Sequence, residues 1–218
     1  MSWVWKSLNS SIGKKLVMAI TGVALMLFLI VHLAGNMSLF GGKDAFNNYV
    51  GLLEHIKPFI RVIEVILALI FILHIFNGTR LWIENKKARP LGYSVNGSRK
   101  NTTVFSRTAF ITGSIVFIFL VIHLQTIWYV FNYSGIEQDL YTITTEWLRV
   151  WWYAALYFIA VLLLGFHLNH GFQSAFQTFG WNHKKYFPFI EKFGTFFAVV
   201  MTIGFGSIPV YFFFLGGK

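Results

Sequence analysis

The stretch that decides the fold is residues 16–40, LVMAITGVALMLFLIVHLAGNMSLF, which contains no charged side chain. About 20 apolar residues, rising about 1.5 Å each, cross a hydrocarbon core about 30 Å thick. Four further stretches of the 218-residue chain meet this requirement: 59–82, 104–131, 150–176 and 189–215. The sequence therefore predicts an all-α integral membrane bundle of five transmembrane helices, with residues 1–218 forming a single membrane domain.

The composition agrees with a membrane protein and excludes several other classes. Hydrophobic residues make up 56% of the chain and charged residues 12%, about half the charge of a typical soluble domain. Such a chain cannot cover a water-facing surface, which excludes a soluble enzyme, a disordered tail and a coiled coil. The absence of cysteine excludes disulfide scaffolds, zinc ribbons, thiolate-held iron–sulfur clusters and covalently attached haem.

The charges divide unequally between the two sides of the five spans. One side holds 13 cations against Glu84 and Glu191, and the other holds five cations against six acids. The 13 cations are Lys6, Lys14, Lys15, Arg80, Lys86, Lys87, Arg89, Arg99, Lys100, Arg107, Lys184, Lys185 and Lys192. Short loops rich in Lys and Arg stay in the cytoplasm. We therefore expect the N-terminus inside and the C-terminus outside, and we attribute the formal charge of +10 to membrane orientation, with no nucleic-acid partner.

The first and third spans share a sequence pattern. An offset of 91 residues aligns the Ile-Thr-Gly of 20–22 with that of 111–113, and His32 with His123. Both spans therefore contain I-T-G-x9-H-L. One such match can arise by chance, but the next two spans show a second match.

The second and fourth spans repeat in the same way. An offset of 93 residues aligns His74 with His167 and Gly78 with Gly171, so that both spans contain H-x3-G. The chain is therefore interpreted as a duplicated two-helix hairpin followed by a fifth helix.

The helical rise places the four histidines at two depths. His32 lies about 25 Å, and His123 about 24 Å, from the basic start of its span, near the outer face. His74 lies only about 9 Å before Arg80 at the inner boundary, and His167 shares its level by the repeat. The sequence predicts an outer and an inner imidazole pair about 15 Å apart.

Matched pairs of intramembrane histidines indicate haem. Polar side chains in a bilayer are costly and usually functional, and histidine is a standard axial ligand of haem iron. Without cysteine the haems are non-covalent, b-type groups. Two histidines fill both axial positions, so the iron carries electrons and does not bind oxygen. The alternative is a haem-free transporter or structural anchor whose histidines hydrogen-bond neighbouring helices.

Four glycines accompany the histidines. Gly22 and Gly113 precede the outer histidines by ten residues, about 15 Å along the helix, which is the depth of the inner pair. A glycine there lets a porphyrin lie against the backbone. Gly78 and Gly171 lie one turn beyond the inner histidines, where a side chain would collide with the porphyrin or its propionates. The alternative for such glycines is ordinary packing between membrane helices.

The segments around the four histidines resemble the ligand helices of a known family. They read FLIVHLAGN (28–36), LHIFNGTRLW (73–82), FIFLVIHLQTIW (117–128) and GFHLNHGFQSAFQTFG (165–180). Together they are similar to the two-haem cytochrome b subunit of succinate:quinone oxidoreductases, which are succinate dehydrogenases or fumarate reductases, of the single-anchor, five-helix type.

The resemblance covers essentially the whole chain and implies ligand assignments. It pairs His32 with His123 on the distal haem and His74 with His167 on the proximal haem, as depth alone does. His170 matches no ligand, and it aligns with an asparagine in the repeat.

The resemblance also implies partners. These are a flavoprotein subunit with FAD and an iron–sulfur subunit on the cytoplasmic face of a bacterial cytoplasmic membrane, and a quinone, of the menaquinone type. The chain has no thiolates, dinucleotide loop or carboxylate cluster, so it is not expected to oxidise a dicarboxylate itself but to contribute the quinone site. A two-haem anchor of another quinone-linked enzyme, such as a formate dehydrogenase or nitrate reductase, stays open as an alternative.

Charged residues near the two pairs are further candidates. Glu64 lies about 15 Å before His74, at the outer level, and is a candidate for proton exchange with quinone. Its alternative role is an ion pair with Arg61 or a position among headgroups. The inner cations Arg80, Arg107 and Lys184 could neutralise haem propionates or be ordinary positive-inside residues. The connections containing His55 and His183 are expected to be loops.

Overall fold

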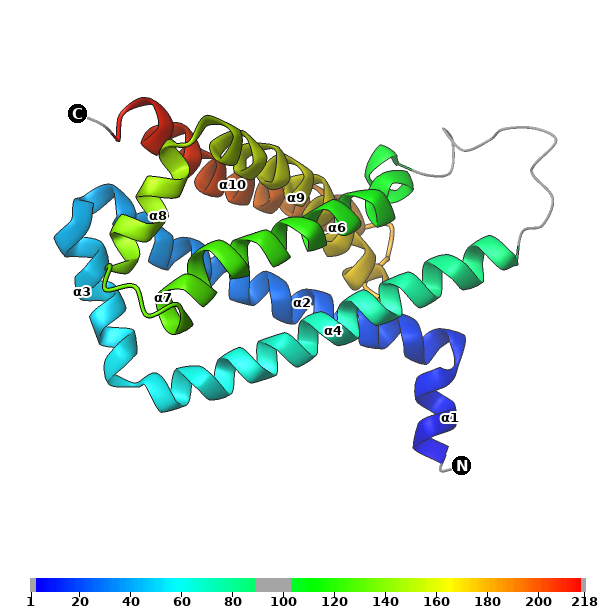
Figure 1. Ribbon diagram of the computed structural model, residues 1–218. Helices are drawn as coiled ribbons and strands as arrows, with labels where there is room; N and C mark the ends of the chain where they lie inside the picture. The colour runs from blue at the N-terminus through cyan, green and yellow to red at the C-terminus, as the bar shows by residue number, and fades with distance from the viewer. Residues whose placement is uncertain (1–2, 89–102, 217–218) are drawn as a thin grey trace.

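The computed structural model describes residues 3–88 and 103–216. Five of its helices begin the candidate membrane spans: α2 (Ser11–Asn36), α4 (Lys57–Lys87), α6 (Val104–His123), α9 (Trp151–Thr178) and α10 (Phe187–Phe214). They lie side by side along most of the molecule (Figure 1), and the described residues contain no strand. The all-α fold with five membrane spans is therefore confirmed.

Local sequence explains where the long helices begin. The side chains of Ser10 and Thr103 accept hydrogen bonds from the backbone N–H three residues later, over 3.0 and 3.1 Å, and so cap α2 and α6. Pro58 and Pro188 lie in the first turns of α4 and α10, where proline loses no helical hydrogen bond. Gly180, with a φ of 83°, follows the end of α9 and allows the chain to turn.

The connections at one end of the bundle contain short helices. The 3-10 turn η1 (Met37–Gly41) leads into helix α3 (Gly42–His55), so His55 ends a helix and does not lie in a loop. A second short helix, α8 (Leu140–Arg149), precedes α9. The loop expectation was wrong here because both segments are short amphipathic helices that pack only one face against the bundle.

The third span changes its helical geometry directly after His123. The π-helix η2 (Leu124–Tyr129) follows α6, and the short helix α7 (Val130–Tyr133) completes the span. A π-helix has a wider turn than an α-helix and is frequently found at functional sites. Side chains of η2 reach both neighbouring spans: Trp128 bonds Glu64 of α4, and Thr126 bonds Tyr153 of α9.

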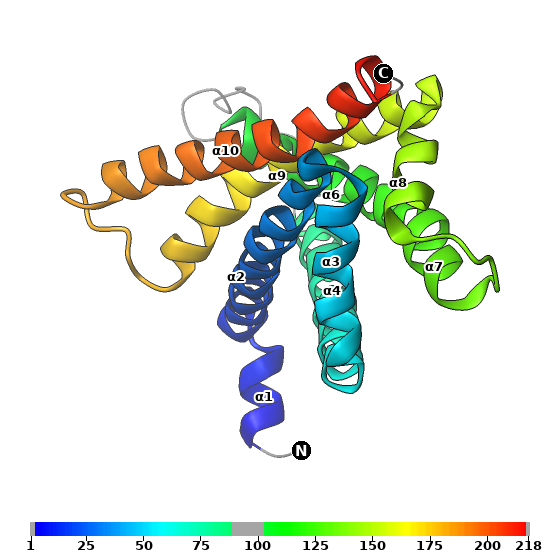
Figure 2. The same cartoon turned by 90° about the vertical axis from the view of Figure 1, so that its left-hand side faces the viewer.

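Two apolar clusters hold the bundle together. The first contains Tyr153 and Phe212 and joins α9 and α10 to α3 and α8 at one end. The second, around Met26 and Met201, joins α2, α9 and α10. Helix α4 takes part in neither cluster, and Asn77 is its only buried residue. Figure 2 shows α4 beside α2, away from α10.

The two ends of the bundle differ in charge. Helix α1 (Trp3–Asn9) and the α9–α10 connection lie at one end, and α3 and α8 lie at the other (Figure 1). The α1 end is the cation-rich one. The C-terminal end of α4 and the N-terminal end of α6 also lie there. Of the predicted inner cations, Arg89, Arg99 and Lys100 lie outside the described residues, as does the outer Lys218.

Candidate functional site: two histidine pairs

The outer histidine pair joins α2 to α6. The ring centroids of His32 and His123 are 6.0 Å apart, with the ring planes at 85°. Phe28 stacks on His32 at 5.2 Å, and its repeat equivalent Phe119 lies 5.9 Å from His123. Phe205 of α10 lies 5.8 Å from His32. The outer imidazoles are therefore surrounded by aromatic rings.

The inner pair joins α4 to α9 and is backed by glycines. The ring centroids of His74 and His167 are 6.2 Å apart, with the ring planes at 77°. A Cβ atom built on Gly22 would lie 3.5 Å from Cε1 of His74, and one built on Gly113 would lie 2.9 Å from Cε1 of His167. Both glycines thus lie at the inner level, where the helical rise placed them, and each faces a histidine of the adjacent span.

The inner imidazoles have hydrogen-bond partners for Nδ1. The Nδ1 atom of His74 is 3.2 Å from Oγ1 of Thr21, whose own proton is donated to carbonyl oxygens of α2. Thr21 therefore accepts the proton of His74 Nδ1. His167 Nδ1 donates to the carbonyl oxygen of Ala109 over 3.2 Å. With Nδ1 protonated, Nε2 is the nitrogen with a free lone pair, the arrangement found in metal-bound histidines.

The outer imidazoles are held differently. His123 Nδ1 lies 2.8 Å from the hydroxyl oxygen of Tyr157 on α9. His32 has Asn36 one turn later, with Nδ2 of Asn36 3.5 Å from Nδ1 and 3.4 Å from Nε2 of the ring. Asn36 is chiefly bound to the backbone oxygen of His32, over 2.8 Å. The outer pair thus has one well-defined Nδ1 partner.

The residues present fit haem better than a bare metal ion. A metal–imidazole bond is about 2 Å long, so two rings on opposite sides of one metal have centroids about 6 Å apart, as both pairs do. Within residues 3–88 and 103–216 no three His, Cys, Asp or Glu side chains gather to hold a metal by themselves. Haem requires only two protein ligands, which each pair supplies. None of the four imidazole rings is fully enclosed by protein, so each stays accessible to a bound group.

The other glycines and His170 take different positions. A Cβ on Gly78 would meet Cε of Met18 at 3.3 Å, and one on Gly171 would meet Cε of Met26 at 3.2 Å. In this structure both glycines allow close packing against α2, which is the alternative that the sequence left open. His170 belongs to neither histidine pair.

Glu64 is part of a polar cluster near the outer end of α4. Its carboxylate accepts hydrogen bonds from Arg61 Nη1 over 2.7 Å and from the indole N–H of Trp128 over 2.9 Å. Arg61 also donates to Asn132 over 2.7 Å and lies over the ring of Trp128. The ion pair with Arg61 foreseen as the alternative is therefore present. Trp128 lies within the π-helix η2, so this part of the third span reaches Glu64 of α4.

Arg80 is engaged at the inner boundary. It donates to Glu84 over 3.0 Å and to Asn9 over 2.8 Å, and Glu84 also forms an ion pair with Lys14. These contacts tie α1 and α2 to the end of α4. The structure therefore gives Arg80 a structural role at this end, and its role toward a propionate stays a prediction.

Tyr157 was not among the residues predicted from the sequence, although the repeat contains the pattern that reveals it. Both Glu64 and Tyr157 precede an inner histidine by ten residues, so the 93-residue offset aligns them. A polar residue at this position lies about 15 Å from the inner level, at the depth of the outer pair. The same spacing that placed Gly22 and Gly113 beside the inner pair thus places two polar side chains beside the outer one.

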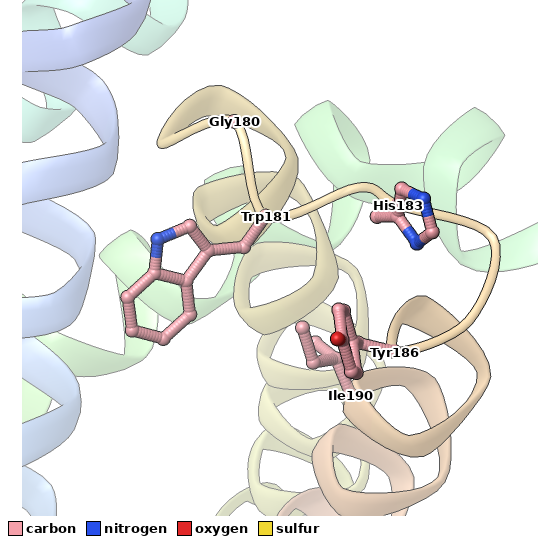
Figure 3. A pocket seen from close by; sticks show the side chains of 5 residues that line it. All are labelled: Gly180, Trp181, His183, Tyr186 and Ile190. Carbon is pink, nitrogen blue, oxygen red and sulfur yellow. The ribbon is translucent and has the colours of Figure 1, made fainter.

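A cavity of about 380 Å³ lies at the connection between α9 and α10, apart from the histidine pairs. Figure 3 shows the residues that line it, which are Gly180, Trp181, His183, Tyr186 and Ile190. His183 accepts a hydrogen bond from the backbone N–H of Lys185 over 3.2 Å. None of the four paired histidines lines this cavity.

Five apolar spans that bring four histidines together in two pairs define a multi-pass membrane protein built around paired imidazoles. Comparison with protein families identifies it further: the chain belongs to the family "Succinate dehydrogenase/Fumarate reductase transmembrane subunit", whose sequence model matches residues 15–90 and 85–206. Neither a curated protein nor a solved structure matches the chain. Family membership identifies a membrane-anchor subunit of such an enzyme.

Proposed function

We propose that the chain is the two-haem cytochrome b anchor of a succinate:quinone oxidoreductase. The observation that carries the proposal is the pair of ring separations, 6.0 and 6.2 Å, between histidines of four different helices. Family membership supports the succinate or fumarate enzyme over other quinone-linked enzymes with two-haem anchors. The chain itself does not oxidise the dicarboxylate.

Each proposed haem has two protein ligands. His32 and His123 would hold the outer haem through their ring nitrogens, and His74 and His167 would hold the inner one. When bound, the two haems supply one-electron carriers at two depths of the membrane. The residues of the chain orient the rings: with Nε2 on the iron, Thr21, the Ala109 carbonyl and Tyr157 would accept the Nδ1 proton at three of the four histidines.

The orientation of the chain sets its partners. We place the α1 end in the cytoplasm, because described cations at this end, including Lys14 and Lys15 of α2 and Lys184 and Lys185 before α10, outnumber the acids. An iron–sulfur subunit docks on this basic face and joins the chain to a flavoprotein subunit with FAD. The inner pair is then the nearer one to the iron–sulfur subunit.

Quinone exchanges electrons and protons near the outer pair in this proposal. Glu64 is the proposed proton-exchanging carboxylate, and menaquinone is the proposed quinone. Arg61 and Trp128 hold the carboxylate by two hydrogen bonds that leave its side chain 31% exposed. A carboxylate that is bound but reachable can take or give a proton without being expelled from the membrane.

Histidine variants of the complete complex test the ligand assignments. We expect two haems per anchor polypeptide in a pyridine haemochrome assay of the wild type. His74→Ala and His167→Ala each lose the same haem, because either change removes one axial ligand of the inner site. His170→Ala is the matched control, one turn from His167 on the same helix, and keeps both haems.

The outcomes separate the proposal from its alternatives. A colourless wild-type complex, or two haems retained in His167→Ala, contradicts the haem assignment. Two haems in a complex that co-purifies with a formate- or nitrate-converting subunit contradicts the assigned enzyme but not the ligands.

A further inference from the structure

Three hydroxyl side chains form a hydrogen-bonded chain that ends on His123. The hydroxyl oxygen of Tyr157 is 2.8 Å from Nδ1 of His123. Tyr153, one turn earlier in α9, donates to the Tyr157 oxygen over 2.8 Å. Oγ1 of Thr126 lies 2.5 Å from the hydroxyl of Tyr153. These contacts connect η2 and α9 beside the outer pair.

Tyr153 is fixed by the outer apolar cluster. Its exposed fraction is 0%, and it packs with residues that include Leu148 and Phe212. A buried tyrosine hydroxyl needs hydrogen-bond partners, and here Thr126 and Tyr157 provide them. Because the ring of Tyr153 cannot move without disturbing this cluster, the position of the Tyr157 oxygen is set by the fold of the protein.

The π-helix keeps the far end of the chain in place. Thr126 lies within η2, and its hydroxyl is 2.7 Å from the carbonyl oxygen of Ile122, the residue before His123. The hydroxyl chain therefore begins and ends on the same segment that carries the histidine. Rotation of His123 away from Tyr157 would break a connected set of bonds and not a single contact.

We infer that Tyr157 is a positioning residue for His123, with Tyr153 as its support. When Nε2 of His123 binds haem iron, as proposed, Nδ1 carries the ring proton. The Tyr157 oxygen, which has two acceptor lone pairs, then accepts this proton as well as that of Tyr153. The bond leaves Nε2 as the ligating nitrogen, fixes the rotation of the ring and makes the imidazole a stronger electron donor. This inference rests on the proposed haem function and adds a residue that controls one of its two sites.

The effect of losing the Tyr157 hydroxyl is expected at the outer site only. His32, the other outer histidine, meets Asn36 only at 3.4 to 3.5 Å from its ring nitrogens. The inner histidines have Thr21 and the Ala109 carbonyl as partners instead. Loss of the Tyr157 hydroxyl is therefore expected to change the outer haem alone.

Tyr157→Phe in the complete complex tests the inference. We expect two haems per anchor, an upward shift of the outer midpoint potential because its ligand donates less charge, altered low-spin EPR g-values of that haem, and haem loss to an acceptor about 10-fold faster from the outer site. Tyr153→Phe shifts the same quantities in the same direction by less. Tyr211→Phe is the control, since it removes a phenol hydroxyl from α10 beside Phe40.

The outcomes distinguish this inference from the function on which it rests. A wild type without haem overturns the proposed function. A two-haem wild type whose outer potential, g-values and loss rate are unchanged in Tyr157→Phe overturns the inference alone. Equal changes at both haems, or the same changes in Tyr211→Phe, show a general structural effect and also overturn it.

Discussion

The inner and outer histidine pairs have nearly the same ring separation but are built differently. At the inner pair, helices approach closely: Gly22 and Gly113 face the rings, and one Nδ1 partner is a backbone carbonyl. At the outer pair, large side chains fill the space, with Phe28 and Phe119 against the rings. Similar ring geometry therefore arises from two kinds of support, backbone proximity and side-chain packing.

This difference predicts which substitutions each pair tolerates. An inner site that depends on the absence of side chains is sensitive to added atoms. An outer site that depends on aromatic rings and hydroxyls is sensitive to their removal. The duplicated hairpin thus supplies equivalent positions, and the surrounding residues give them unequal roles.

The largest effect is expected from Gly113→Ala. A Cβ atom there lies 2.9 Å from His167 Cε1, too close for ordinary contact, so the ring must move and most of the inner haem is lost. The equivalent change Gly22→Ala places its Cβ 3.5 Å from His74, an ordinary contact, and keeps the haem. The haem content per polypeptide, measured for each variant, tests both expectations. Equal retention in the two variants would show that the glycines are packing residues only.

Glu64→Gln tests whether the outer side also carries the proton chemistry. We expect quinone-linked turnover of the complex to fall about 100-fold, the scale of a lost general acid or base, with haem content unchanged. Glu54→Gln is the control, because Glu54 is an exposed partner of Lys57 at the same end of the bundle. Normal turnover in Glu64→Gln would show that the Glu64 carboxylate has only a structural role, as the ion-pair partner of Arg61.

A smaller effect at the inner pair is expected from Thr21→Val. The change removes the acceptor for His74 Nδ1 at constant volume, so haem dissociation from the inner site should accelerate about 10-fold. Thr112 occupies the repeat-equivalent position, but its hydroxyl bonds only carbonyls of its own helix. Thr112→Val should therefore change nothing, and equal acceleration in both variants would contradict the assigned role of Thr21.

The smallest effect concerns the helices that cover the outer end. Asp139 caps α8 and binds Lys43 and Asn47 of α3. Burial alone would raise the pKa of the Asp139 carboxyl, but hydrogen bonds from Lys43, Asn47 and Thr142 outweigh it and hold the pKa well below its usual range. Asp139→Ala should cost about 1 kcal/mol, as the loss of a helix cap does, and lower the melting temperature by a few degrees.

The sign of the pH dependence follows from this lowered pKa. The folded protein binds the Asp139 proton less readily than the unfolded chain, so the stabilisation is complete above roughly pH 5 and is lost as pH falls through the folded-state pKa. The gap in melting temperature between wild type and Asp139→Ala should narrow on acidification. Glu137→Ala, an exposed neighbour, is the control. A gap that stays constant in acid would exclude the ionised carboxylate as its source.

Much of the fold and part of the site could be predicted from the sequence. The spans follow from the length of apolar stretches, and the depths of the histidines follow from a constant rise per residue. Helix α3 and the π-helix η2 could not be predicted, because their apolar faces are short and their geometry depends on packing against other spans. Tyr157 was missed because a tyrosine in a membrane helix is unremarkable until its neighbour is known.

The sequence by itself determined that this chain has five stretches long and apolar enough to cross a membrane and that its histidines occur at two levels. Both are one-dimensional properties, set by hydrophobicity and helical rise. Only the tertiary structure decided which atoms meet each imidazole: Thr21 and the Ala109 carbonyl at one level, and Tyr157 at the other. The physical reason is that hydrogen bonds and ring contacts depend on the rotation and separation of neighbouring helices, which no single helix specifies.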